Sequence, residues 1–170
     1  ETPMWSQDRY AEASRFAAMA HSGQTLPNAD LPYLLHVTQV AMEVVAVLRA
    51  EPGHDEDLAV LCALLHDTVE DTAVTVEQLA AAYGQPVADG VLALTKDESL
   101  PKEQQIRDSL RRIRQQPRAI WLVKLADRIV NLQLPPRHWE PAKIALYKAD
   151  AREILEALGV ASPLLAARLE

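Results

Sequence analysis

The chain has 170 residues, of which 49% are hydrophobic and 5% aromatic, and its formal net charge at pH 7 is −7. This length is enough to bury one core of ordinary size without covalent staples. The negative charge argues against a nucleic-acid polymer as partner, because phosphate backbones bind basic surfaces. It does not exclude a small anionic ligand, since a few local cations or a metal ion can override the overall sign.

Two N-terminal helices are predicted from the periodicity of apolar residues, over residues 6–21 and 33–49. The segment between them, SGQTLPNADLP, has the composition of turns. A third helix is expected over residues 58–67, LAVLCALLHD, and it is apolar nearly all round, which indicates a central, buried element. The acidic residues 55–57 precede it, where the helix dipole favours negative charge.

The rest of the chain also predicts helices. Thr75 and Gln78 form a capping-box pattern at the start of a helix that ends before Gly84. Further helices are expected over residues 86–96, 100–116, 118–134 and 141–158, followed by a short tail helix. With Ala and Leu dominant, the chain is predicted to be all-α, a bundle of about eight to ten helices. We find no repeat or linker, so residues 1–170 are expected to form one domain.

The single cysteine, Cys62, lies in the apolar stretch AVLCALL. Such a setting favours a buried thiol that packs as a small hydrophobe. No apolar run approaches the roughly 18 residues of a membrane span, and the N-terminal residues lack a secretory signal pattern. We therefore predict a cytoplasmic protein that does not enter a membrane.

Polar residues crowd the end of the buried third helix, in LLHDTVEDT. His66, Asp67, Glu70 and Asp71 lie three or four positions apart, so they share one face if the helix continues. Burying ionised carboxylates is costly unless a cation or hydrogen bonds compensate, and a divalent metal ion is the simplest compensation. The alternative is a solvated helix end at which His66 is a hydrogen-bonded boundary residue.

Two further polar residues interrupt apolar helices. His36 lies within YLLHV, and Asp127 lies within VKLAD. Together with His66 and Asp67 they supply two imidazoles and two carboxylates. A nitrogen and oxygen donor set without thiolate suits Mn²⁺, Fe²⁺ or Zn²⁺ in open coordination better than a closed structural zinc site.

The order H…HD…D over this spacing resembles the HD-domain metal-dependent phosphohydrolases. The segments AHSGQ, PYLLHV, ALLHDTVEDT, LTKDESLPK and VKLADRIVN also occur in the order seen in the hydrolase domain of the RelA/SpoT family. The resemblance runs from about residue 8 to residue 158, and the short length is similar to that of the small alarmone hydrolases. It implies a single HD-type helical domain over residues 1–170.

The resemblance also implies a reaction, the removal of the 3′-pyrophosphate from a guanosine tetra- or pentaphosphate of the stringent response. The products are GDP or GTP and pyrophosphate. The implied ligands of one Mn²⁺ ion are His36, His66, Asp67 and Asp127, and the implied catalytic pair that orients or deprotonates the attacking water is Glu70 and Asp71. These roles agree with general chemistry, since a metal ion lowers the pKa of a water molecule and a carboxylate can take its proton.

Substrate contacts are expected around Asp127 and on the next helix. Lys124, Arg128 and Asn131 lie at −3, +1 and +4 from Asp127, on or beside its face of the helix. In the family, the cation and the Asn of this motif contact the nucleotide, whereas the alternative for Arg128 is a surface ion pair. Lys143 and Tyr147 are also implied to contact phosphate or ribose. Lys96 and Lys102 could contact the pyrophosphate, although loop lysines are more often simply solvated.

The segment after AHSGQ departs from the family pattern. The family usually places an Arg or Lys there that stacks on guanine, but here Thr25, Leu26 and Pro27 follow, then Asn28 and Asp30. This leaves open an adenine-based alarmone, or another nucleotide 3′-phosphate ester, as substrate. A third hypothesis is a non-catalytic module that senses a nucleotide, against which the intact Glu70 and Asp71 argue.

Overall fold

The computed structural model describes residues 5–27, 29–133 and 138–170. In these ranges it contains ten α-helices and one 3₁₀ helix, and its only β-type pairing is an isolated bridge between Thr25 and Pro32. The all-α prediction is therefore confirmed. The elements are α1 (Gln7–Ala20), α2 (Leu34–Ala50), α3 (Glu56–Leu65), α4 (Thr68–Asp71), α5 (Val76–Tyr83), α6 (Gln85–Leu94), α7 (Lys102–Ile113), α8 (Arg118–Gln133), α9 (Pro141–Leu158), η1 (Gly159–Ala161) and α10 (Pro163–Leu169).

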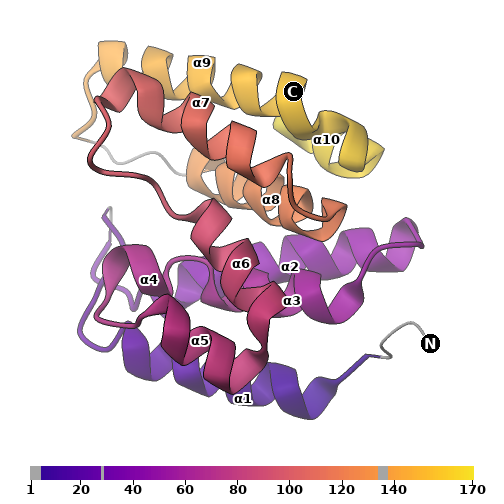
Figure 1. The fold of residues 1–170 in the computed structure, drawn as a ribbon. Coiled ribbons are helices and arrows are strands. Elements are labelled where there is room, and N and C mark those ends of the chain that lie inside the picture. Colours follow the sequence, from indigo (N-terminus) through magenta and orange to yellow (C-terminus); the bar gives the residue numbers. More distant parts are fainter. Residues whose placement is uncertain (1–4, 28, 134–137) are drawn as a thin grey trace.

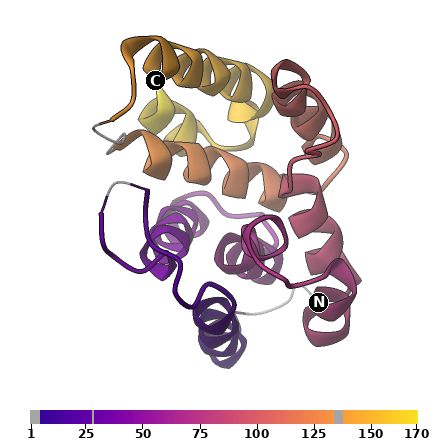
Figure 2. The ribbon, with the colours of Figure 1, turned by 90° about the vertical axis from the view of Figure 1, so that its left-hand side faces the viewer.

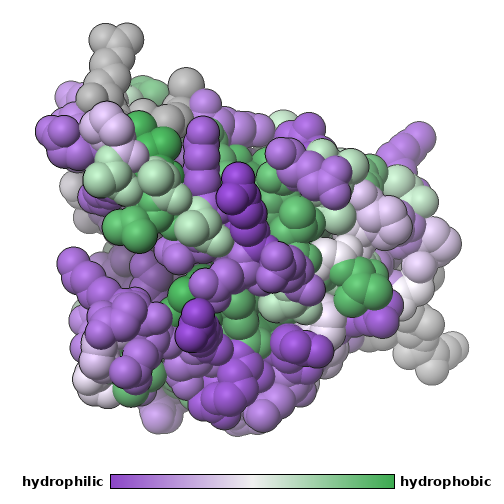
Figure 3. All heavy atoms as spheres, turned by 90° about the horizontal axis from the view of Figure 1, so that it is seen from above, coloured by the Kyte–Doolittle hydropathy of each residue, from purple (hydrophilic) through white to green (hydrophobic). Residues whose placement is uncertain are grey.

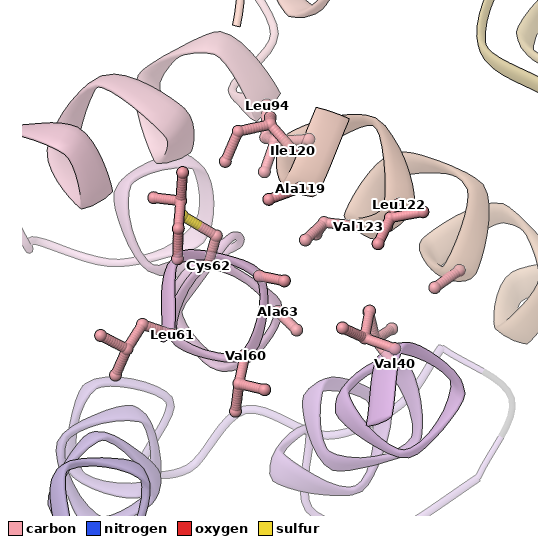
Figure 4. Packing of buried hydrophobic residues seen from close by; sticks show 14 of the residues in the cluster. Val40, Val60, Leu61, Cys62, Ala63, Leu94, Ala119, Ile120, Leu122 and Val123 are labelled. Atoms are coloured by element: carbon pink, nitrogen blue, oxygen red, sulfur yellow. The ribbon is translucent and has the colours of Figure 1, made fainter. Parts of the chain in front are cut away.

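Helix α3 lies at the centre of the molecule, as its apolar sequence predicts. It packs against α1, α2, α6 and α8, and all residues from Leu58 to Leu65 are buried. Figure 4 shows the labelled side chains of α3, among them Leu61 and Cys62, leaving the helix in different directions into the core. Leu61 is only 1% exposed, so its truncation to Ala would destabilise the fold by roughly 2–5 kcal/mol.

The helices form two groups that meet at α8. Helices α7 to α10 lie together on one side, and α1 to α5 lie on the other (Figure 1). Helix α8 packs on α2 and α3, and thus joins the groups. The α1–α2 loop, α4 and the C-terminal end of α8 reach the same side of the molecule, which faces the viewer in Figure 2.

Helix α6 approaches the centre closely because it carries a glycine where it meets α3 and α8. A Cβ atom at Gly90 would lie 2.5 Å from Ile120 Cδ1 and 2.9 Å from Cys62 Sγ. Both distances are shorter than a van der Waals contact. A larger residue at this position would therefore push α6 away from α3 and α8.

Most helix boundaries agree with the prediction, and the caps explain them. Thr75 Oγ1 accepts from the Gln78 amide at 3.2 Å, and Gln78 Oε1 accepts from the Thr75 amide at 2.9 Å, so the capping box is confirmed. Asp55 Oδ1 accepts from the amide of Leu58 at 3.1 Å and caps α3. The acidic start of this helix is therefore stabilised by a direct hydrogen bond as well as by the helix dipole.

One boundary was predicted wrongly. Helix α3 ends at Leu65, and His66 and Asp67 form a turn before the short helix α4, rather than the end of one continuous helix. The Thr68 hydroxyl donates to the Leu65 carbonyl at 2.8 Å, so a side chain satisfies a carbonyl at the end of α3. A threonine that bonds locally in this way competes with regular helix geometry.

Most side chains of helix α7 are polar, and Ser109, Leu110 and Ile113 are its buried residues. Figure 3 views the molecule from the side of α7 and α9 and shows a largely hydrophilic surface with separate hydrophobic patches. Within α7, Arg111 and Arg112 pair with Asp108 at 2.7 and 2.9 Å. Of the helices described, none combines the length and the apolar character that a bilayer span requires.

Candidate metal centre and active site

Four of the predicted residues converge from three parts of the fold. His36 lies in the first turn of α2, His66 and Asp67 form the turn between α3 and α4, and Asp127 lies within α8. Each offers one ligand atom, and these atoms all lie within 4.8 Å of one another. Residues that are 91 positions apart in the sequence are thus adjacent in space.

The donor atoms face each other closely enough for one cation. His36 Nε2 lies 3.0 Å from Asp127 Oδ1 and 3.5 Å from Asp67 Oδ2. His66 Nε2 lies 3.1 Å from Asp67 Oδ2 and 3.4 Å from Asp127 Oδ1. Two nitrogens and two carboxylate oxygens therefore surround a common point, which is a donor set for Mn²⁺, Fe²⁺ or Zn²⁺.

The orientation of His66 fits a metal ligand. Its Nδ1 lies 2.7 Å from the Ala63 carbonyl, which assigns the proton to Nδ1 and leaves the Nε2 lone pair free. His66 Nε2 is buried, and the described part of the chain offers it no hydrogen bond of good geometry. A buried nitrogen with an unused lone pair, aimed at two carboxylates, is what bound metal would satisfy.

The electrostatics of the cluster point the same way. Burial raises the pKa values of Asp67 and Asp127, but the adjacent imidazoles outweigh it and lower both, that of Asp127 furthest. Burial lowers the pKa of His66, but the two carboxylates outweigh it and raise it well above its ordinary value. The carboxylates thus require a positive charge beside them, which a protonated imidazole or a divalent cation supplies.

The acidic pair lies on α4 beside this cluster. Glu70 Oε1 accepts from the backbone amide of Lys96 at 2.8 Å, and Asp71 Oδ2 accepts from Gln24 Nε2 at 3.2 Å. Burial raises the pKa of both carboxyl groups, and the nearby charge of Asp67 adds to this. A raised pKa makes a carboxylate a stronger base, which suits proton transfer from water.

A cavity of about 150 Å³ opens next to the cluster and is lined mainly by polar groups. Both acidic residues of α4 line it, together with Lys96, Lys124, Arg128, Asn131 and Tyr147. Lys124 is 5% exposed, and its Nζ lies 3.8 Å from Asp127 Oδ2. Asn131 Nδ2 donates to Asp127 Oδ1 at 3.2 Å. The face of α8 predicted from helical spacing is thus the face that borders the cavity.

Arg128 is held in place from the next helix. It is 4% exposed, its guanidinium lies 3.8 Å from the centre of the Tyr147 ring, and its Nη1 donates to the Tyr147 carbonyl at 3.4 Å. The alternative of a surface ion pair is therefore wrong. Burial raises the pKa of Tyr147 to about 12, so its hydroxyl is protonated near neutral pH.

Two of the lysines predicted to contact the substrate lie outside the lining of this cavity. Lys143 is exposed, does not line the cavity, and places its Nζ 4.4 Å from the centre of the Trp139 ring. Lys102 is the first residue of α7, is exposed, and also lies outside the cavity lining. A contact of either lysine with substrate stays a prediction.

A second pocket, of about 290 Å³, adjoins the first and shares Tyr33, Asn131 and Tyr147 with it. Its remaining walls are largely apolar side chains from the α1–α2 loop, α2 and the segment before α9: Leu26, Pro27, Ala29, Leu31, Leu35 and Trp139. Asn28 of the departing loop lies outside the described residues. In the described part of this loop, the side chains between Gln24 and Tyr33 that line the pocket are apolar.

Sequence reasoning missed three residues. Tyr33 contacts Asp67 and Gln24 contacts Asp71. Both lie within motifs of the family pattern, PYLLHV and AHSGQ, and these motifs are the signal that could have identified them. Trp139 is the third, and it packs edge-on against Tyr147 with ring centres 5.0 Å apart. His21 Nδ1 lies 2.8 Å from Gln24 Oε1, and this contact holds the loop.

Comparisons with known proteins agree with this geometry. A profile of the family described as HD domain matches residues 13–169. The guanosine-3′,5′-bis(diphosphate) 3′-pyrophosphohydrolase MESH1 of Xenopus tropicalis is 32% identical over 164 residues, which cover 94% of this chain and 89% of that protein. The protein of the same name from Danio rerio is 33% identical over 153 residues, covering 86% and 82%.

A solved structure described as a metazoan ortholog of SpoT that hydrolyses ppGpp and plays a role in starvation responses has the same fold. Its TM-score is 0.83 at 26% identity, and the match covers 98% of this chain and 94% of that chain. The resemblance inferred from the motifs is confirmed. The chain therefore belongs to the HD-domain family and, within it, to the RelA/SpoT-type hydrolases that the MESH1 proteins represent.

Proposed function

We propose that this chain removes the 3′-pyrophosphate from guanosine alarmones such as ppGpp, releasing GDP or GTP and pyrophosphate. The observation that carries the proposal is the convergence of two histidines and two aspartates, with ligand atoms within 4.8 Å, beside a cavity that Glu70 and Asp71 line. The relatives named for this activity, which this chain matches over most of its length, support it. Residues 1–170 would act as one domain, and the cytoplasmic location stays a prediction.

We infer that one divalent cation, Mn²⁺ by preference, is held by His36, His66, Asp67 and Asp127. Such a cation would lower the pKa of a water molecule and polarise a phosphoryl oxygen. The protein keeps His66 ready through the Ala63 carbonyl and keeps Asp127 in place through Asn131. Hydrogen bonds of this outer kind commonly change metal affinity 10- to 100-fold.

Glu70 and Asp71 would orient the attacking water and accept its proton. Both border the cavity, and burial raises the pKa of each, so they are stronger bases than ordinary carboxylates. The water oxygen would bond to the phosphorus attached to the 3′ oxygen, and the bond from this phosphorus to the 3′ oxygen would break. The 3′ oxygen would leave with the bonding electrons and take a proton from solvent to become the ribose 3′-hydroxyl. General-base catalysis of this kind typically contributes 10²- to 10⁴-fold to a rate.

The charge of the pyrophosphate would be met by Lys96, Lys124 and Arg128. All three line the cavity, and the two on α8 are buried. Arg128 is held by its stacking on Tyr147, so its guanidinium needs little ordering when a phosphate binds. Asn131 and Tyr147 border both pockets and are placed to contact the ribose.

A second candidate substrate is an adenine alarmone of the ppApp type. The adjoining pocket favours it, because the described part of its wall is mostly apolar and carries no Lys or Arg that would select guanine. The amides of Gln39, Asn131 and Gln133 also border it. An amide can present either its oxygen or its NH₂ group, so it can serve either purine.

Turnover of matched guanosine and adenosine 3′-pyrophosphates with added Mn²⁺ tests these proposals. Release of pyrophosphate from the guanosine compounds is the expected result. Cleavage of the adenosine compounds alone would favour the second candidate. Tight binding of either compound without cleavage would favour a nucleotide-sensing module and contradict the hydrolase.

A further inference from the structure

The loop between α1 and α2 contacts two carboxylates of the site, that of Asp67 in the four-residue cluster and that of Asp71 in the acidic pair. Gln24 and Tyr33, at the two ends of this loop, are tied to each other, because the Tyr33 amide donates to the Gln24 carbonyl at 2.9 Å. Between them, Thr25 pairs with Pro32, and the Leu26 amide donates to the Leu31 carbonyl at 2.9 Å. The loop thus has a closed base that presents two polar side chains on the same side.

Tyr33 holds the carboxylate of Asp67. Its hydroxyl donates to Asp67 Oδ2 at 2.6 Å, and this is the same oxygen that lies 3.1 Å from His66 Nε2 and 3.5 Å from His36 Nε2. The Tyr33 ring is itself fixed between the rings of His21 and His36, with centres 5.0 and 5.2 Å away. A rigid donor therefore sets the rotation of this carboxylate.

Gln24 holds the carboxylate of Asp71. Its Nε2 donates to Asp71 Oδ2 at 3.2 Å, while its Oε1 lies 2.8 Å from Nδ1 of the buried His21. The second bond fixes which end of the amide faces Asp71. Asp71 is thus oriented by a chain of two hydrogen bonds that starts at the end of α1.

We propose that Tyr33 and Gln24 are positioning residues with separate tasks: Tyr33 orients Asp67 for cation binding, and Gln24 orients Asp71 toward the attacking water. The inference about Gln24 rests on the proposed hydrolase function. The inference about Tyr33 needs only that the four-residue cluster binds a cation. The two tasks differ because one carboxylate belongs to the cluster and the other borders the cavity beside it.

The variants Y33F and Q24M separate the two tasks. Tyr33→Phe keeps the ring but removes the donor, so we expect Mn²⁺ affinity to fall about 10- to 100-fold. At saturating Mn²⁺ much of kcat should return. Gln24→Met keeps the length of the side chain but removes the amide, so we expect unchanged Mn²⁺ affinity, a kcat lowered about tenfold, and an unchanged KM.

Tyr10→Phe is the matched control. Tyr10 also donates its hydroxyl to an aspartate, Asp57, at the start of α3 and outside both pockets beside the cluster. The Y10F substitution also removes a hydrogen bond from a tyrosine hydroxyl to an aspartate. It therefore shows what the loss of such a bond does to the stability of the fold alone. We expect wild-type Mn²⁺ affinity and kcat from Y10F, with a melting temperature lowered about as much as in Y33F.

The measurement is calorimetric titration of metal-free protein with Mn²⁺ at a temperature below all the melting transitions, followed by steady-state kinetics. Mn²⁺ binding in Y33F as tight as in Y10F would overturn the role of Tyr33. A wild-type kcat in Q24M, or a loss of Mn²⁺ affinity there, would overturn the role of Gln24. Weaker Mn²⁺ binding in Y33F than in Y10F supports the role of Tyr33 even if the wild-type chain cleaves no alarmone. Failure of the inference about Tyr33 can therefore be distinguished from failure of the proposed hydrolase function.

Discussion

The two adjoining pockets are built in different ways. The inner cavity takes its charged and polar groups largely from α4, α8 and the turn after α3, next to the most buried part of the core. The outer pocket takes much of its wall from the α1–α2 loop and from Trp139, which precedes α9. Rigid helices hold catalytic groups in place, whereas loops vary with little effect on the fold. The inner cavity would thus determine the hydrolytic reaction, and the outer pocket would determine which nucleobase the substrate carries.

The largest effect is expected from Asp127→Ala, which removes one of the four converging donors. Metal binding should be lost and kcat/KM should fall by more than about a thousandfold, because both the cation and its charge balance are removed. The control is Asp108→Ala on α7, which breaks only the pairs with Arg111 and Arg112. Wild-type turnover by the Asp127 variant would contradict the assigned centre.

The next largest effect is expected from Glu70→Gln. It should keep Mn²⁺ affinity but lower kcat by about 10²- to 10⁴-fold, since an amide cannot accept a proton from water. Burial raises the pKa of Glu70, so in the wild type the rate should rise with pH through a pKa above that of an ordinary Glu. The variant should lose this rise. Glu77→Gln, at an exposed position of α5, is the control.

Arg128→Lys tests the boundary between the two pockets. It keeps the positive charge but removes the planar group that stacks on Tyr147 and donates to its carbonyl. We expect KM to rise about tenfold, equivalent to roughly 1.4 kcal/mol of binding, with a smaller change in kcat. The exposed Arg107→Lys should leave both constants unchanged. A change in kcat alone would place Arg128 in the chemical step instead.

The smallest effect is expected from Trp139→Ala, in the outer pocket. Loss of its edge-on contact with Tyr147 should raise KM a few-fold for guanosine and adenosine substrates alike and leave kcat unchanged. The control is Trp5→Ala, at an exposed position just before α1. A large loss of kcat would show that the outer pocket takes part in the chemistry, and the contrast between the pockets would fail.

Much of the fold and of the site was accessible from the sequence. Helix periodicity, the Thr75 cap and the Asp55 cap depend on residues three or four positions apart, so the chain itself encodes them. His36 and Asp127 were also visible, because a polar side chain within an apolar helix needs a partner. The motifs around them supplied the family, and the helical spacing around Asp127 indicated the face that borders the cavity.

Other features depended on how the helices pack. At the break after Leu65 a threonine hydroxyl bonds back to the Leu65 carbonyl, and helical propensity reports neither the break nor this bond. The bond from Tyr33 to Asp67 and the contact of Trp139 with Tyr147 join segments that only tertiary packing brings together. Lys143 Nζ lies over the Trp139 ring and does not line the inner cavity, which its position in the sequence does not reveal. A local sequence pattern indicates that a polar residue within an apolar helix needs a partner. The arrangement of the helices determines which residue that partner is.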